Sequence, residues 1–422
     1  MNSGSANKNE NHFENDSVQD LKGKAVVFLA DGMADLPLEE LGGRTPLEAV
    51  ETPWMDSIAA KGASGTFLTL PEGFPTSSDA ANMSVLGYSL AKYYPGRGPI
   101  ESVSRDIRLE DEDVAWRCNL VNVEDGILRD YSAGHISGED ALVLMQDLQK
   151  EFGSEKVTFH SGVSYRNLLI LHGREFSDQV AYFKPDSSQD EPVSALRLKA
   201  LDNSPEAAHT VAFLEDLSGK TAAFLSAHPL NRNRKVPANR IWPWSPGRRP
   251  DFLPFCEKYE GKRGAVITAV DVIAGIAKCA GMEVIPVPGA TGYIDTNYEG
   301  KAAAAIRAIE QYDFVYIHVE AIDECSHEGS LELKMRAISD FENRIVKPVM
   351  QALEGRGVTF AVLPDHPVPV KLRKHTRTPV PVALCGPYIS ADSVKTYSER
   401  EALNGSLGFM QEDEFIRKVL NL

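Results

Sequence analysis

The sequence predicts an α/β protein with a doubly wound core sheet that is interrupted by an inserted α+β domain. Two observations predict the core: short apolar strands alternate with helical segments on both sides of the chain's middle, and several of these strands run directly into acidic residues. A buried strand with a polar end is typical of the carboxyl edge of a parallel sheet, where ligands bind. The third observation is a change of texture between residues 111 and 240, where short alternating runs and turn-rich stretches predict the insert.

The core elements are expected in this order. A strand at residues 25–30 leads into Asp31 and Gly32, and a helix follows at 52–63 with Pro53 in its first turn. Within the insert we expect strands at 115–123 and 167–172 and one helix. After the insert, alternating strands and helices return, and the segments that carry this pattern are 265–279, 282–287, 301–312, 314–319, 331–353 and 358–363. This pattern predicts three parts: a disordered tail at 1–21, a core at 22–110 and 241–422, and an inserted domain at 111–240.

Composition and charge exclude several classes of protein. Hydrophobic residues make up 43% and charged residues 25% of the 422 residues, which is ordinary for a globular chain, and no run approaches the ~18 apolar residues of a membrane span. The formal net charge of -16 disfavours a nucleic-acid partner. Five scattered cysteines fit neither a disulfide framework nor a CxxC metal site, and the first twenty residues have no secretory signal pattern, so we expect a cytoplasmic protein.

At four places, acidic residues, histidines or a serine are expected at or just beyond the carboxyl end of a predicted core strand. These residues are Asp31, Ser78, Asp323 with His327, and Asp365 with His366, followed by His375. Carboxylate plus imidazole suits Mn, Zn or Fe, and two such residues four apart share one helix face. Each motif alone is more often a turn or a chance spacing. Because adjacent residues on a strand point apart, the Asp-His pair favours two ions, which would clamp a phosphoryl group and activate a serine.

Taken together, these motifs resemble a known family. Asp-Gly-Met at Asp31, the stretch from Ser78 to Tyr88, Gly-Arg-Gly-Pro at 96–99, Asp-Glu-x-x-His at Asp323 and Asp-His at Asp365 are similar to the archaeal-type cofactor-independent phosphoglycerate mutases. That family uses no 2,3-bisphosphoglycerate and belongs to the alkaline phosphatase superfamily. The resemblance covers residues 23–422, and it implies an alkaline-phosphatase-like core sheet.

The resemblance also implies a site and an activity. Ser78 would be the nucleophile that becomes phosphorylated during the interconversion of 3-phosphoglycerate and 2-phosphoglycerate. Two divalent metal ions are implied, typically manganese, with zinc, cobalt or magnesium as alternatives. One ion would take Asp323, His327 and His375, and the other would take the second group: Asp31, Asp365, His366 and the oxygen of Ser78.

The insert is expected to act as a lid that grips a small phosphorylated metabolite. Its candidate binding residues are polar side chains between structural ones, which suit a phosphate and carboxylate clamp: Arg166, His135, His228, Asn231, Asn239 and Arg240. A surface ion pair is the alternative role for Arg166, and a hydrogen-bonded framework role is the alternative for His135 and His228. The alternative functions are a homoserine phosphotransferase, suggested by the run 115–120 and by 132–137, a phosphomonoesterase, and a non-catalytic metal-binding protein. No oligomeric state is predicted.

Overall fold

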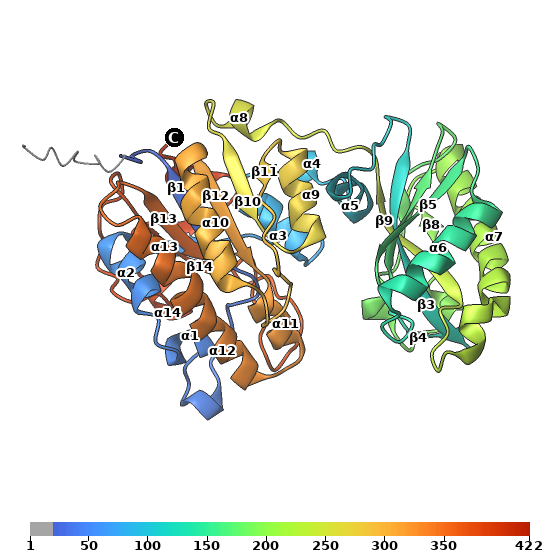
Figure 1. The fold of residues 1–422 in the computed structure, drawn as a ribbon, viewed down its shortest axis with the longest axis horizontal. Helices are drawn as coiled ribbons and strands as arrows, with labels where there is room; N and C mark the ends of the chain where they lie inside the picture. The colour runs from blue at the N-terminus through green and yellow to red at the C-terminus, as the bar shows by residue number, and fades with distance from the viewer. Residues whose placement is uncertain (1–19) are drawn as a thin grey trace, which may run out of the picture.

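A computed structural model describes residues 20–422, so the predicted tail lies outside the described residues except at its end. The larger of its sheets has eight strands, drawn at the left of Figure 1. In spatial order these strands are β11 (Glu283–Val284), β10 (Gly264–Ile267), β12 (Phe314–Val319), β1 (Ala25–Ala30), β13 (Thr359–Leu363), β14 (Val380–Cys385), β2 (Ala63–Phe67) and β15 (Gly408–Met410). The five strands from β11 to β13 are parallel, and β14 is antiparallel to both of its neighbours.

Helices cover both faces of this sheet, as the doubly wound prediction requires. In β1, Val26, Phe28 and Ala30 face one apolar core while Val27 and Leu29 face the other, because successive side chains of a strand point to opposite faces. The helices that pack on the first face are α2 (Pro53–Lys61), α10 (Tyr298–Gln311), α12 (Leu331–Phe341) and α13 (Lys347–Ala352). Those on the second face are α3 (Ser78–Val85), α5 (Arg97–Ser104), α9 (Asp271–Cys279) and α15 (Glu414–Leu420).

The helix expected at 331–353 is one continuous helical run with a defect. A π-helical turn at Glu342–Val346 separates α12 from α13, and Pro348 follows it in the first turn of α13. Because proline has no N–H to donate, it interrupts the regular hydrogen-bond ladder at this point. The remaining short helices are α1 (Pro46–Ala49), α4 (Leu90–Tyr93), α8 (Phe255–Lys258), α11 (Ala321–His327) and α14 (Glu399–Ala402).

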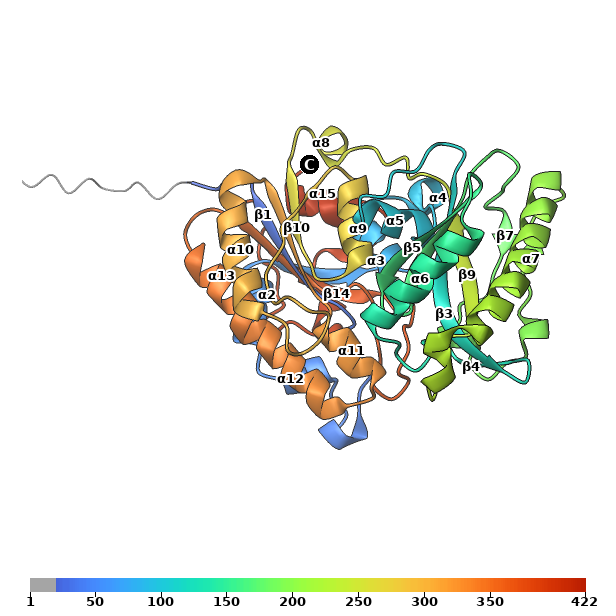
Figure 2. The same ribbon diagram turned by 45° about the vertical axis from the view of Figure 1, so that its right-hand side comes forward.

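A second sheet forms a separate lobe beside the first (Figures 1 and 2). Its strands run in the order β4 (Ile127–Asp130), β3 (Val114–Glu124), β6 (Arg166–Leu171) and β5 (Val157–Val163), with β9 (Arg240–Gly247) also paired to β3. Two helices pack on this sheet around one apolar core, α6 (Gly138–Phe152) and α7 (Pro205–Ala227), and a small ribbon joins β7 (Val180–Ala181) to β8 (Lys199–Ala200). Because β9 belongs to this sheet, we propose that the insert extends to Gly247 rather than ending at residue 240.

The helices of residues 20–422 include none that is both long enough and apolar enough to cross a membrane.

Candidate metal centre and active site

The carboxyl ends of three neighbouring strands carry most of the predicted ligands. Asp31 directly follows β1, Asp323 lies in α11 just after β12, and Asp365 with His366 follows β13 by one residue. Because β12, β1 and β13 are parallel neighbours, their carboxyl ends meet at one edge of the sheet. The structure therefore brings together residues that are more than 300 positions apart in the sequence.

Asp323, His327 and His375 form the first triad. The Nε2 atom of His327 lies 3.4 Å from Asp323 Oδ2, and the Nε2 atom of His375 lies 3.6 Å from Asp323 Oδ1. The outward Nδ1 atoms of the two rings face backbone carbonyl oxygens, of Arg373 at 3.0 Å and of Thr76 at 3.1 Å. This leaves both Nε2 atoms directed inward, 2.8 Å apart, which is how metal-ligating histidines are usually held.

Asp31, Asp365 and His366 form the second triad, next to Ser78. The Nε2 atom of His366 is the common neighbour: it lies 3.4 Å from Asp31 Oδ1, 3.4 Å from Asp365 Oδ2 and 3.3 Å from Ser78 Oγ. All three triad side chains are fully buried, while Ser78 at the start of α3 is half-buried. The two triads touch, because the rings of His366 and His375 stack with their centroids 3.9 Å apart.

The electrostatics of this edge are those of a cation site. Burial, and after it the neighbouring carboxylates, raise the pKa of Asp31 well above its ordinary value, and burial raises the pKa of Asp365 to about 7. Burial also lowers the pKa of His375 to about 4, which keeps that imidazole neutral and able to ligate. Asp31 Oδ1 and Asp323 Oδ1 are buried without a hydrogen-bond partner. Buried unpaired carboxylate oxygens are costly, and divalent cations would satisfy them.

Three further residues belong to this edge and were missed from the sequence. His318 Nε2 lies 3.0 Å from Asp31 Oδ2 and 3.8 Å from Glu320 Oε2, and Asp31, His318 and Glu320 are close enough to share an ion. Asn82 donates to Asp365 Oδ2 at 2.9 Å and to the carbonyl of Ser78 at 2.8 Å. The available signal was His318 itself, a polar residue within an otherwise apolar buried strand and two residues from Glu320 on the same face.

Arg166 and His135 lie on an aromatic face of the second lobe. Arg166 is exposed, with its guanidinium 5.6 Å from the ring centroid of Tyr165. His135 lies edge-on to the rings of Tyr131 and Tyr165, with centroids 6.4 and 6.2 Å away. The charge of Arg166 acts on a residue at the metal edge. Burial and Asp323 raise the pKa of Glu324, and the positive charges of His327 and Arg166 oppose that rise.

The other substrate-binding candidates make contacts within the second lobe. His228 is buried with Nε2 3.0 Å from Asp147 Oδ2, and its Nδ1 accepts from the N–H of Leu230. Asn231 donates to two backbone carbonyls and accepts from one N–H, and Asn239 pairs with both backbone groups of Val123. These bonds indicate a framework role for all three. Arg240 is half-buried at the start of β9, where burial lowers the pKa of its guanidinium.

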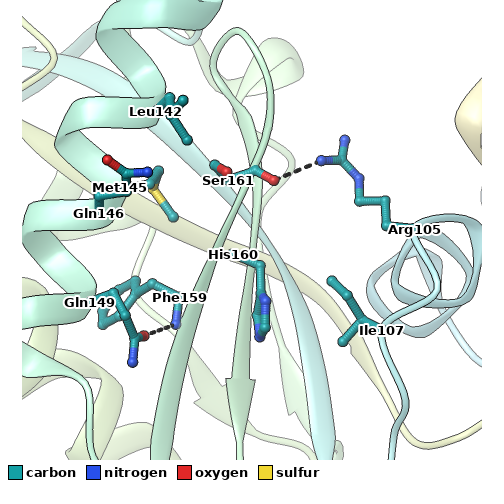
Figure 3. A pocket seen from close by; sticks show the side chains of 9 residues that line it. All are labelled: Arg105, Ile107, Leu142, Met145, Gln146, Gln149, Phe159, His160 and Ser161. Atoms are coloured by element: carbon teal, nitrogen blue, oxygen red, sulfur yellow. Dashed lines mark hydrogen bonds between the residues drawn. The ribbon is translucent and has the colours of Figure 1, made fainter.

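The cavity in Figure 3 is separate from this edge. It encloses about 460 Å³ between α6, β5 and the segment after α5, with Leu142, Phe159 and Arg105 among its walls. None of the residues predicted to bind metal or substrate lines it. This cavity is therefore not part of the candidate metal centre.

Comparisons with known proteins agree with the resemblance found from the motifs. A family model for 2,3-bisphosphoglycerate-independent phosphoglycerate mutase matches residues 59–231. Proteins of that name from Methanosarcina acetivorans and Methanocaldococcus jannaschii are 46% and 35% identical to this chain, over 94% and 95% of it and over 100% and 97% of their own lengths.

Solved structures agree as well. A protein from Pyrococcus horikoshii superposes with a TM-score of 0.79 at 26% identity, with 96% of this chain and 98% of that chain covered. The cofactor-independent phosphoglycerate mutase from Thermoplasma acidophilum gives 0.63 at 25% identity, with 94% and 98% covered. These matches confirm the predicted fold class, and with the near-complete relatives they show that this chain belongs to the 2,3-bisphosphoglycerate-independent phosphoglycerate mutase family.

Proposed function

We propose that this protein is a metal-dependent phosphoglycerate mutase that interconverts 3-phosphoglycerate and 2-phosphoglycerate through a phosphoserine at Ser78. The observation that supports this proposal best is the position of Ser78 Oγ next to the second triad. That oxygen lies 3.3 Å from His366 Nε2, which in turn has a carboxylate oxygen of Asp31 and one of Asp365 as neighbours. A serine oxygen among such side chains is placed to be an activated nucleophile.

Two divalent ions fit the residues present. One would be held by Asp323, His327 and His375, and the other by the second triad with the Ser78 oxygen. Mixed carboxylate and imidazole ligands suit manganese, with zinc, cobalt and magnesium as alternatives. When bound, such ions lower the pKa of a serine hydroxyl and neutralise the charge of a phosphoryl group.

The start of α3 supplies further groups for the phosphoryl oxygens. Ser77 is the N-cap residue, and its side chain makes no capping hydrogen bond to the helix. The first N–H groups of α3 therefore remain free to meet an anion, and the N-terminal end of a helix favours negative charge. In the forward reaction Ser78 Oγ would lose its proton and bond to phosphorus as the bond to the C3 oxygen breaks, and the C3 oxygen would take up a proton to become a hydroxyl. The glycerate then turns, and its C2 oxygen takes the phosphoryl group back from Ser78.

The second lobe would enclose the substrate and exclude water. Arg166 would supply a guanidinium for a bidentate contact with a phosphate or carboxylate, because it is exposed beside Tyr165 and none of the ion pairs found in residues 20–422 involves it. Enclosure is required because water that reached the phosphoserine would release phosphate and turn the mutase into a phosphatase. We also propose a cytoplasmic location, which is supported by five cysteines that are all free of disulfides in the described part of the chain.

The experiment is to mix the protein with Mn²⁺ and phosphoryl-labelled 3-phosphoglycerate, quench in acid and find the label by mass spectrometry. We expect label on Ser78, and we expect neither label nor turnover in Ser78→Ala. Ser77→Ala is the matched control, since Ser77 is adjacent, buried and without a hydrogen-bond partner for its oxygen. Label on Ser77, or turnover in Ser78→Ala, would overturn the mechanism. Transfer to homoserine from a phosphoryl donor, with no reaction of 3-phosphoglycerate, would favour the alternative function.

A further inference from the structure

A fully buried lysine lies against the loops that carry the second triad. Lys334 of α12 is 0% exposed, and its ammonium donates to the carbonyl of Gly32 at 3.1 Å and to that of Val368 at 2.9 Å. Gly32 directly follows Asp31, and Val368 lies two residues after His366. One side chain therefore ties together the two loops that leave β1 and β13.

Gly32 connects Lys334 to the second triad through two hydrogen bonds. Its N–H donates to Asp365 Oδ1 at 3.3 Å, while its carbonyl accepts from Lys334. The N–H of Gly32 lies in the peptide group that joins Asp31 to Gly32, and its carbonyl lies in the next peptide group. The hydrogen bond from Lys334 to this carbonyl therefore restricts the turn in which Asp31 and Asp365 meet. Asp365 is held further by the N–H of His366, which donates to the same oxygen at 2.8 Å.

The positive charge of Lys334 would repel a metal ion if it were unpaired, but the carboxylate of Asp35 pairs with it. Asp35, which is 7% exposed, accepts from Lys334 at 2.8 Å and from the N–H of Val370 at 3.0 Å. The pair is thus neutral as a whole and is linked to both loops. Buried ion pairs seldom stabilise a fold more than apolar side chains of the same size would, so stability alone does not explain this one.

We propose that Lys334 is a positioning residue that sets the spacing of Asp31, Asp365 and His366 and so controls the affinity of the second triad for a divalent ion. Its ammonium already donates to Gly32, Ala34, Asp35 and Val368, so it would act through these groups rather than by contact with an ion or substrate. The first triad does not depend on it in this way, because none of the hydrogen bonds of Lys334 goes to Asp323, His327 or His375. The inference rests on the metal-dependent function proposed above, but its test measures metal binding and needs no turnover.

The test uses two backgrounds that each keep one triad. His327→Ala leaves the second triad, and Asp365→Asn leaves the first. Lys334→Met is added to each, and Mn²⁺ binding is measured by titration calorimetry on metal-free protein. We expect about tenfold weaker binding or more in the His327→Ala background, the size typical for residues that orient metal ligands, and a change of less than about twofold in the Asp365→Asn background.

Ile338→Ala is the matched control, because Ile338 lies one turn further along α12, is buried and packs only in the apolar core. We expect it to lower the melting temperature and to leave both affinities unchanged. If Lys334→Met does not fold, Lys334→Gln takes its place with the same expected pattern. Equal losses in both backgrounds, no loss in either, or a selective loss in Ile338→Ala would overturn the proposal. Absence of Mn²⁺ binding in both backgrounds would overturn the ligand assignment and this proposal with it, whereas failure to label Ser78 would leave the measured affinities intact.

Discussion

Gly32 lies between a ligand of each triad, because its N–H donates to Asp365 and a side chain added to it would meet Asp323. Its replacement by alanine tests how tightly these two ligands are packed. Its φ of +68° lies in the left-handed region, and a Cβ added there would be 2.7 Å from Asp323 Cα, 2.8 Å from its Oδ1 and 2.9 Å from its Cβ. Favourable contacts between carbon atoms are about 3.5–4.0 Å. Asp323 would therefore have to move by several tenths of an ångström, together with the start of α11.

The expected cost has two parts. A left-handed conformation costs an alanine about 1–2 kcal/mol, and forcing a methyl group into a packed interior costs about 1–3 kcal/mol more. Gly32→Ala should thus lower the free energy of unfolding by about 2–5 kcal/mol. Gly42→Ala is the matched control, because Gly42 has a φ of +66° and no atom within 4 Å of the added Cβ. It should cost about 1–2 kcal/mol, the strain alone.

Denaturant unfolding of the metal-free variants gives the two free energies, and metal analysis after loading gives the stoichiometry. We expect Gly32→Ala to lose Mn²⁺ from the Asp323 triad, since a shift of about 0.5 Å is enough to spoil a metal site. Gly42→Ala should bind as much Mn²⁺ as the parent. The reasoning is refuted if Gly32→Ala costs no more than Gly42→Ala and both keep two ions.

Two further predictions concern buried charges. Glu101→Gln should lower the free energy of unfolding by about 3–5 kcal/mol, because buried Glu101 pairs with the buried guanidinium of Arg117 and the half-buried one of Arg97, and its loss leaves the charge of Arg117 buried without a partner. A loss below about 1 kcal/mol in denaturant unfolding would contradict this. The metal-free protein should lose stability as the pH rises from about 6.5 to 8. Burial raises the pKa of Asp365 to about 7 and that of Glu320 to about 8. In this pH range the folded state therefore still holds protons on these carboxyl groups that the unfolded state has released. The buried histidines whose pKa is lowered oppose this loss near pH 6.5, because an unfolded imidazole is still half protonated there, and their contribution is small by about pH 7.5. A stability that rises with pH between about 7.5 and 8 would count against the assignment.

Much of the candidate site was predictable because its signals are local. Asp31 follows an apolar strand directly, and the Asp365–His366 pair follows another after one proline. A parallel sheet brings such strand ends together at one edge. The helix predicted within the insert is α6, Gly138–Phe152, where Ser137 accepts the capping hydrogen bond from Asp140. In these places one short stretch of sequence carries the whole signal.

The residues that were missed depend on contacts between distant segments. His318 lies beside Asp31 only because β12 and β1 pair in the register that sets Leu29 opposite His318. A lysine in an amphipathic helix is usually exposed to solvent, and only the tertiary contacts show that Lys334 is buried against the loops of Gly32 and Val368. His228 lies in a motif that suggests binding, but its partner Asp147 is 81 positions away. Such pairings have no local signature in a single sequence.

The division of labour between the two lobes follows from where these contacts lie. Both triads and Lys334 belong to the large sheet and its helices, whereas Arg166, His135 and Tyr165 belong to the second lobe. Under the proposed function, we therefore expect substitutions of Arg166 and His135 to change which phosphorylated molecule binds without moving a metal ligand. A side chain added at Gly32, by contrast, would meet Asp323, and the N–H of Gly32 donates to Asp365, so that substitution would disturb a metal ligand of each triad. We therefore propose that the core sheet supplies the groups for phosphoryl transfer and that residues of the second lobe set the choice of substrate.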